Sequence, residues 1–175
     1  MIYVIDHEDS FTYNLVHLLE GFAPTYISNY YDINWHQLEK SKIIIFSPGP
    51  GNPSNYPETQ KIYKKYKGNK KIIGICLGFQ QILYAENANI VPQKKIYHGY
   101  QSKIKALKES SLFKPNKVFL VGRYHSLKLK EPFNSSSLKI TMRCVESNVA
   151  MAIEDTINNV YGFQFHPDSF LTVDG

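Results

Sequence analysis

Three continuous apolar runs constrain the fold of this chain more than any other feature. They cover residues 2–5, 43–46 and 72–75, with the sequences I-Y-V-I, I-I-I-F and I-I-G-I. A strand without polar alternation is buried on both faces, which is typical of parallel sheets covered by helices on both sides. The sequence therefore predicts an α/β fold with an open, mostly parallel twisted sheet and helices on both faces.

Amphipathic segments separate these runs. Ser10 is placed to cap a helix that carries Phe11, Leu15, Leu18, Leu19 and Phe22 at helical spacing. Pro57 fits the first turn of a helix that continues to about residue 67, and residues 77–85 form a further helix. An extended stretch near residues 26–27 adds another strand to this half.

The second half of the chain has short extended runs in place of the alternating strands and helices of the first half. Beyond residue 88, short extended runs favour hairpins that add antiparallel strands to the sheet. No linker or repeat interrupts the sequence, so we expect a single domain over residues 1–175 with one core. The expected strands cover residues 117–121, 138–143, 149–154 and 160–165.

Hydrophobicity and cysteine content limit the cellular compartments in which this chain can fold. No apolar run approaches the roughly 20 residues of a membrane helix, and the N-terminus lacks a secretory signal. We therefore expect a soluble cytoplasmic protein that binds no membrane. Two cysteines, Cys76 and Cys144, show neither metal-type spacing nor a disulfide framework, and both thiols fit a reducing compartment.

The positive charge does not indicate nucleic-acid binding. The formal net charge is +5, but the lysines are scattered and no RNA-binding or helix-turn-helix signature accompanies them. The densest group is typical of the solvated face and C-terminal end of a helix. It comprises Lys61, Lys64, Lys65, Lys67, Lys70 and Lys71.

The segment G-I-C-L-G at residues 74–78 has the spacing of a nucleophile elbow, with Cys76 between a strand and a helix. A nucleophile on so sharp a turn crowds its neighbours, and glycine two residues to either side removes the clashing side chains. The helix N-terminus favours the thiolate of Cys76. The unpaired N–H of Leu77 can donate to an oxyanion formed by thiolate attack on a carbonyl.

Each cysteine also has a plain structural interpretation. Free cysteines are often small buried residues, and Cys76 could be one at a strand end. Cys144 lies within an alternating strand without glycine neighbours, so burial alone explains it.

A candidate base lies at the end of the last expected strand. The expected strand covers residues 160–165, and His166-Pro167-Asp168 follow directly at its C-terminal end. Pro167 keeps His166 extended. Side chains two apart in an extended chain share a side, which brings the Asp168 carboxylate close enough to orient the His166 ring. Cys76, His166 and Asp168 then form a nucleophile, a base and an orienting group, although a histidine at a strand end is also often structural.

The other histidines suggest no metal site. His7, His17 and His36 fall in loop or helix-surface contexts without ligand spacing. We therefore expect no metal and no organic cofactor in this chain.

Six segments together resemble the class I glutamine amidotransferases, whose sheet is of the flavodoxin-like kind. The likeness is strongest to the small subunits of anthranilate synthase and aminodeoxychorismate synthase. The segments follow the family order across nearly the whole chain. They are D-S-F-T-Y-N-L at 9–15, S-P-G-P-G at 47–51, G-I-C-L-G at 74–78, H-G at 98–99, R-Y-H-S-L at 123–127 and G-F-Q-F-H-P at 162–167.

The resemblance implies a reaction and a partner. Cys76 would attack the side-chain amide of L-glutamine, and ammonia would pass to a chorismate-binding synthase subunit, component I, in a heteromer. His166 would shuttle protons while Asp168 holds it, and His125 would be part of the substrate wall and not the base. By the same resemblance the substrate contacts are Gly49, Pro50 and Gly51, which also supply an oxyanion donor, together with Leu77, Gln80, Ser126 and Leu127.

Three positions depart from the family pattern. Asp168 stands where glutamate is usual, and its side chain is one methylene shorter. We expect the activity to be reduced, or the shorter side chain to be compensated elsewhere, without loss of all activity. Phe79 and Tyr100 stand where histidine and lysine are common, and either would alter the pocket rim or the partner surface. Relatives also usually continue beyond residue 175 into a final helix, so we expect apolar surface to be exposed.

Two other functions remain open. A stand-alone cysteine hydrolase of γ-glutamyl or peptide bonds would use the same elbow and triad. A catalytically impaired interaction subunit would be consistent with Asp168 and the short C-terminus. The sequence also does not separate anthranilate synthesis for tryptophan from aminodeoxychorismate synthesis for folate.

Overall fold

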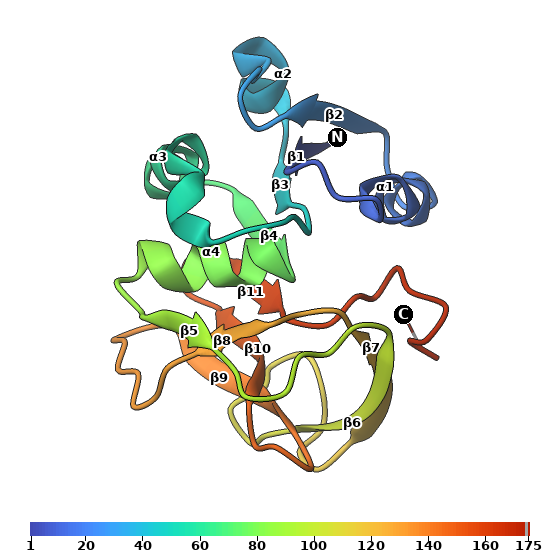
Figure 1. The fold of residues 1–175 in the computed structure, drawn as a ribbon. Coiled ribbons are helices and arrows are strands. Elements are labelled where there is room, and N and C mark those ends of the chain that lie inside the picture. Colours follow the sequence, from blue (N-terminus) through green and yellow to red (C-terminus); the bar gives the residue numbers. More distant parts are fainter. Residues whose placement is uncertain (174) are drawn as a thin grey trace.

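A single nine-stranded sheet organises the computed structural model, which describes residues 1–173 and 175 (Figure 1). Its strand order is β2-β1-β3-β4-β11-β10-β9-β6-β7, and β5 and β8 form a separate two-stranded sheet. In chain order the elements are β1 (Ile2–Asp6), α1 (Thr12–Glu20), β2 (Thr25–Asn29), α2 (Trp35–Lys40), β3 (Ile43–Phe46), the 3-10 turn η1 (Pro53–Asn55), α3 (Pro57–Tyr66), β4 (Lys71–Ile75), α4 (Leu77–Ala85), β5 (Ile90–Pro92), β6 (Tyr100–Ala106), β7 (Val118–Arg123), β8 (Leu127–Leu129), β9 (Lys139–Cys144), β10 (Ala150–Asp155) and β11 (Val160–Phe163).

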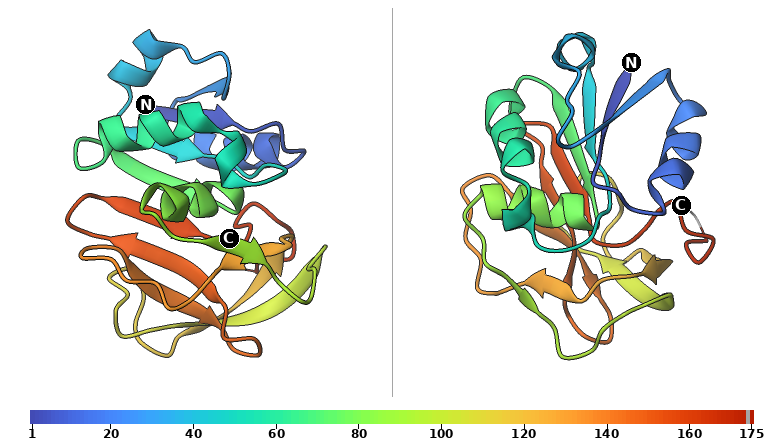
Figure 2. Two further views of the ribbon diagram at one scale, coloured as in Figure 1. Left: turned by 60° about the vertical axis from the view of Figure 1, so that its left-hand side comes forward. Right: turned by 45° about the horizontal axis from the view of Figure 1, so that its top comes forward.

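The sheet has a parallel half and an antiparallel half. Strands β2, β1, β3, β4 and β11 pair in parallel, whereas β11, β10, β9, β6 and β7 pair as antiparallel neighbours. Helix α1 lies on one side of the parallel strands and α3 and α4 lie on the other, as the right-hand view of Figure 2 shows. The predicted α/β architecture with added antiparallel strands is therefore confirmed.

The two faces of the parallel strands carry separate cores. On β1, Ile2 and Val4 pack with Leu15 and Val16 of α1, while Tyr3 and Ile5 face the opposite cluster. Ile2 and Val4 face away from Tyr3 and Ile5 because successive side chains of a strand point to opposite faces. The second cluster also contains side chains from α2, α3 and α4. Its helical members are Leu38, Ile62, Tyr63, Tyr66, Phe79, Ile82 and Leu83.

Several local predictions were wrong in detail. Helix α1 begins at Thr12 after Phe11, and Ser10 makes no side-chain cap. Instead Asp9 Oδ1 accepts the N–H of Phe11 at 2.8 Å, because a carboxylate one residue earlier reaches the turn. Phe22 lies beyond the helix and is exposed.

Helix α2 and strand β6 were not anticipated. Helix α2 has six residues with one buried side chain, Leu38, which is too short for a periodic signal. Strand β6 does alternate, but its buried positions are Ser102, Ile104 and Ala106, and only one of these is a large apolar residue. The inward face of β6 is therefore hard to recognise from hydropathy.

An apolar hollow of about 230 Å³ lies against one face of the parallel strands. Leucine, isoleucine and phenylalanine side chains from α1, β3, β4 and β11 dominate its lining. Its aliphatic and aromatic lining includes Leu15, Leu18, Leu19, Ile45, Ile73, Ile75, Phe113, Phe163 and Phe165.

Candidate functional site

Cys76 occupies a strained turn between β4 and α4. Its backbone has φ 53° and ψ −101°, a region that residues with a side chain rarely adopt. Gly74 and Gly78 permit the turn, since a Cβ on Gly78 would collide with the carbonyl of Phe46 and one on Gly74 would collide with the backbone of Gly78. The G-I-C-L-G spacing therefore has the geometry expected of a nucleophile elbow.

A methyl group on Gly78 should destabilise the protein. We expect Gly78→Ala to lower the free energy of unfolding by about 3 kcal/mol, because the elbow backbone and β3 are in direct contact and must separate. Urea unfolding measures the change. Gly21→Ala is the control, because Gly21 has helical φ −63° and its added Cβ would lie 3.4 Å from its nearest neighbour, so the effect should stay within about 1 kcal/mol. Equal losses in both variants would contradict the close approach.

The start of α4 and the S-P-G-P-G loop line the same hollow as Cys76. Leu77 is the first residue of α4, so its N–H has no partner within the helix. In the S-P-G-P-G loop, Tyr56 donates its hydroxyl to the carbonyl of Pro50 at 2.7 Å. Because a trans peptide holds C=O and N–H on opposite sides, that hydrogen bond turns the Gly51 N–H away from Tyr56. Sequence reasoning missed Tyr56, since no motif marks it.

His7 supports this loop from behind. A Cβ on Gly49 would lie 2.5 Å from the Cβ of His7, so loop and histidine are in close contact. The His7 ring lies 3.2 Å from Ser47 Oγ and 2.9 Å from Thr59 Oγ1. Burial of the ring lowers the pKa of His7 to about 3. His7 was expected in an unremarkable loop context, and it is instead a fully buried neutral group.

This burial predicts acid sensitivity. His7 has a pKa near 3 when folded and near 6.5 when unfolded, so the unfolded chain holds one more proton between these values. Stability from His7 is complete above pH 6.5 and is lost as the pH falls towards 3. We expect His7→Gln to reduce the slope of unfolding free energy against pH by about 1 kcal/mol per pH unit between pH 4.5 and 6. Urea titrations measure this slope, and an equal change in the exposed control His17→Gln would contradict it.

His166 and Asp168 approach one another behind Cys76. The His166 Nδ1 lies 3.6 Å from the Asp168 Oδ1, and both side chains are almost wholly buried. Within the described residues neither ring nitrogen of His166 has a hydrogen-bond partner, and neither does either carboxylate oxygen of Asp168. Such contacts are often long in ligand-free sites and shorten when substrate binds.

The pairing arises differently from the prediction. Strand β11 ends at Phe163, and His166 makes only an isolated bridge to Gly122. A turn then follows, in which the N–H of Ser169 donates to the carbonyl of His166 at 3.3 Å. Asp168 therefore reaches His166 through a turn and not through the alternation of an extended strand.

The charge state of His166 follows from its neighbours. Burial acts to lower the pKa of His166, but the nearby Asp168 carboxylate and Cys76 outweigh it and raise the pKa to about 10. Two aromatic rings pack against the imidazole, with centroids 5.3 Å away for Phe11 and 4.9 Å away for Tyr124, and these two rings also contact each other at 5.0 Å. At neutral pH His166 is therefore an imidazolium, ready to donate a proton to a leaving group.

A hollow of about 150 Å³ opens in front of Cys76. It brings together segments far apart in sequence, and it holds the volume of about five water molecules, enough for an amino-acid side chain. All seven residues expected from the resemblance to contact substrate line it, together with Tyr124 and His125. The expected residues are Gly49, Pro50, Gly51, Leu77, Gln80, Ser126 and Leu127.

His125 cannot serve as the base. Arg123 Nε donates to His125 Nε2 at 3.0 Å, so that nitrogen is an acceptor and the proton lies on Nδ1, 2.8 Å from the carbonyl of Leu127. Burial, and then the charge of Arg123, lower the pKa of His125 to about 3. The interpretation of this segment as a wall of the hollow agrees with the geometry.

Two departures from the family pattern have different surroundings. Phe79 is fully buried among the core residues and does not reach the rim of the hollow, so the expectation for it was wrong. The reason is its direction on α4, which faces the sheet near Gly162. Tyr100 is half exposed on β6, where its ring lies edge-on to that of Tyr97 at 6.0 Å.

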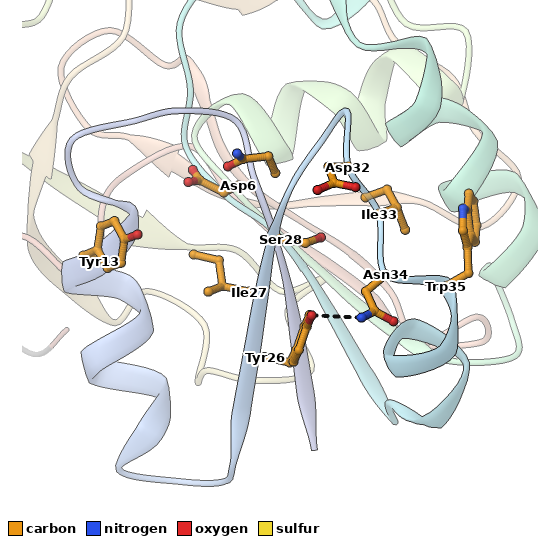
Figure 3. A pocket seen from close by; sticks show the side chains of 10 residues that line it. Asp6, Tyr13, Tyr26, Ile27, Ser28, Asp32, Ile33, Asn34 and Trp35 are labelled. Carbon is orange, nitrogen blue, oxygen red and sulfur yellow. Dashed lines mark hydrogen bonds between the residues drawn. The ribbon is translucent and has the colours of Figure 1, made fainter.

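A larger hollow of about 600 Å³ lies elsewhere, beside the edge strand β2 (Figure 3). Its lining includes Asp6, Asp32, Asn34 and Trp35, but no cysteine or histidine. Among residues 1–173 and 175, no group of three metal-binding side chains occurs. None of the helices in that part of the chain combines the length and the apolar character needed to cross a bilayer.

The fold and the elbow define the class of protein, an α/β protein with a buried cysteine in a strained strand-to-helix turn at the carboxyl edge of its parallel strands. Residues 3–175 match the family model of glutamine amidotransferase class-I. The chain belongs to that family.

Curated relatives and a solved structure are similar to this chain over nearly its whole length. The chain is 36% identical over 178 residues to anthranilate synthase component 2 of Lactococcus lactis, covering 100% of this chain and 89% of the relative. It is 35% identical to anthranilate synthase component 2 of Helicobacter pylori, with 99% and 91% covered. A glutamine amidotransferase structure from Thermotoga maritima superposes with a TM-score of 0.74 at 16% identity, covering 95% of this chain and 75% of that one, which shows the shared fold.

Proposed function

We propose that this chain is the glutaminase subunit of an anthranilate synthase, hydrolysing L-glutamine to glutamate and ammonia. The observation that carries the proposal is the hollow at Cys76, where the elbow, the S-P-G-P-G loop and the R-Y-H-S-L segment meet in front of one thiol. The component 2 relatives, which match nearly the whole chain, support the assignment to a synthase.

The reaction begins with acyl transfer to sulfur. The Cys76 thiolate attacks the side-chain carbonyl carbon of glutamine, and the N–H groups of Leu77 and Gly51 stabilise the resulting oxyanion. As the C–N bond breaks, the His166 imidazolium donates a proton to the leaving nitrogen, which departs as ammonia. A γ-glutamyl thioester on Cys76 and a neutral imidazole remain.

Water completes the cycle. Neutral His166 takes a proton from a water molecule that attacks the thioester, a second oxyanion forms in the same place, and the thiolate leaves as glutamate is released. The imidazolium is restored, so one glutamine and one water give one glutamate and one ammonia. Asp168 holds the ring and favours its charged form. No metal or organic cofactor is needed for these steps.

We further propose that ammonia passes to a component I subunit that binds chorismate. The test is glutamate release from glutamine by the purified chain, with and without a component I protein. Release that rises with the partner is the expected result, and the product formed from chorismate then separates anthranilate from 4-amino-4-deoxychorismate. Glutamate release at the same rate with and without the partner would indicate a stand-alone hydrolase. No glutamate release in either mixture would indicate an impaired interaction subunit.

A further inference from the structure

A buried glutamine joins the substrate wall to the nucleophile. Gln164, just after β11, is fully buried, and its Nε2 lies 3.5 Å from the Cys76 carbonyl oxygen and 3.8 Å from the Cys76 Sγ. Its Oε1 accepts a hydrogen bond from Gln80 Nε2 at 3.1 Å. Gln164 therefore contacts both the thiol and a residue that lines the hollow.

The Cys76 carbonyl fixes the direction of this chain of amides. A backbone carbonyl can only accept, so the Gln164 amide must present its NH₂ group to Cys76 and its oxygen to Gln80. Gln80 must then donate its own NH₂ group to Gln164, which leaves Gln80 Oε1 as the remaining polar atom. Among the described residues no hydrogen bond reaches that oxygen, and Gln80 lines the hollow.

We propose that Gln164 is a positioning residue that donates an N–H to the Cys76 thiolate and sets Gln80 with its oxygen towards the substrate. The proposal rests on the glutaminase function and extends it to a residue behind the hollow. An N–H beside sulfur stabilises the thiolate over the thiol, because hydrogen bonds to charged groups are stronger than neutral ones. An acceptor at Gln80 is complementary to the ammonium group of an amino acid and not to its carboxylate.

A simpler role for Gln164 is to fill a buried polar site. That role requires only that its amide be hydrogen-bonded, which any stable arrangement would satisfy. The two roles differ in one measurable property, the dependence of Cys76 reactivity on pH. If Gln164 only fills a buried polar site, its substitution leaves the pH dependence of Cys76 reactivity unchanged as long as the protein folds.

Gln164→Glu provides the test, because glutamate has the same shape and still accepts from Gln80. Its carboxylate cannot donate to sulfur and adds a negative charge beside the thiolate. We expect iodoacetamide to alkylate Cys76 about tenfold more slowly at pH 7, and the midpoint of its pH profile to move to higher pH. Mass spectrometry of the Cys76 peptide follows the reaction and separates it from Cys144.

Gln81→Glu is the matched control. Gln81 is the adjacent buried glutamine on α4, but its oxygen accepts from Gln60 and no hydrogen bond joins its side chain to Cys76 in the described residues. The control should keep the natural alkylation profile. A second variant, Gln164→Met, removes the donor without adding charge and should give a smaller shift in the same direction, which covers the case in which the glutamate variant does not fold.

The substrate side gives an independent readout. Loss of the Gln80 orientation should raise the KM for glutamine about tenfold in Gln164→Met. An unchanged alkylation profile in folded Gln164 variants would overturn the proposal. Alkylation requires no glutamine, so an inactive natural protein with a shifted profile would count against the glutaminase assignment and leave the role of Gln164 standing.

Discussion

Cys76→Ala should abolish glutamine hydrolysis, with glutamate release falling by a factor of about 10⁴ or more. The reason is that, among the described residues, Cys76 has the only thiol that lines the hollow, and without it no covalent thioester can form. A coupled glutamate assay with and without a component I partner measures the loss. The variant should still bind glutamine, because the substrate wall is intact.

Cys144→Ala is the matched control for this experiment. Cys144 is the other buried free cysteine, and its sulfur accepts a hydrogen bond from Arg123 at 3.4 Å on β9, outside the hollow. Hydrolysis in this variant should stay within about threefold of the natural rate. Equal losses in the two variants, or persistent hydrolysis in Cys76→Ala, would contradict the assignment of the nucleophile.

Asp168→Asn should lower kcat by a factor of about 10² to 10⁴, the second-largest effect expected. An amide cannot stabilise the imidazolium, so the pKa of His166 should fall from about 10 towards 6.5. The acid that protonates the leaving nitrogen is then scarce at neutral pH. Steady-state kinetics measure kcat, and an NMR titration of the His166 ring measures the pKa.

Asp168→Glu is the informative comparison. The added methylene restores the side-chain length usual in the family and can shorten the 3.6 Å separation from His166. We expect its kcat to stay within about tenfold of the natural value, with a raised His166 pKa retained. If Asp168→Asn kept both the natural kcat and the natural pKa, the carboxylate would have no part in orienting the base.

The sequence was informative wherever a local rule forces a structure. The continuous apolar runs predicted β1, β3 and β4 because full burial leaves no polar alternation. Pro57 marked the first residue of α3, and the glycines around Cys76 marked an elbow because only glycine tolerates the approach of β3 and α4. Local sequence was therefore sufficient to name a candidate nucleophile and a candidate base.

The sequence was uninformative wherever contacts are distant. No local pattern marks Gln80 as buried, yet it is buried and bound to Gln164, 84 positions along the chain. His7 and Tyr56 carry no motif, and their roles depend on which loop the fold places against them. Asp168 was assigned to the right neighbour by the wrong geometry, because a turn replaced the expected extended segment.

By itself, then, the sequence determined strands β1, β3 and β4, helices α3 and α4, the elbow and the identity of the chemical groups. These features follow from burial, glycine sterics and side-chain chemistry within a few residues. Tertiary structure alone decided which segments line the hollow at Cys76, that His125 is neutral while His166 is charged, and how Gln164 connects Gln80 to Cys76. The physical reason is that hydrogen-bond direction, desolvation and charge depend on neighbours that only the folded chain brings together.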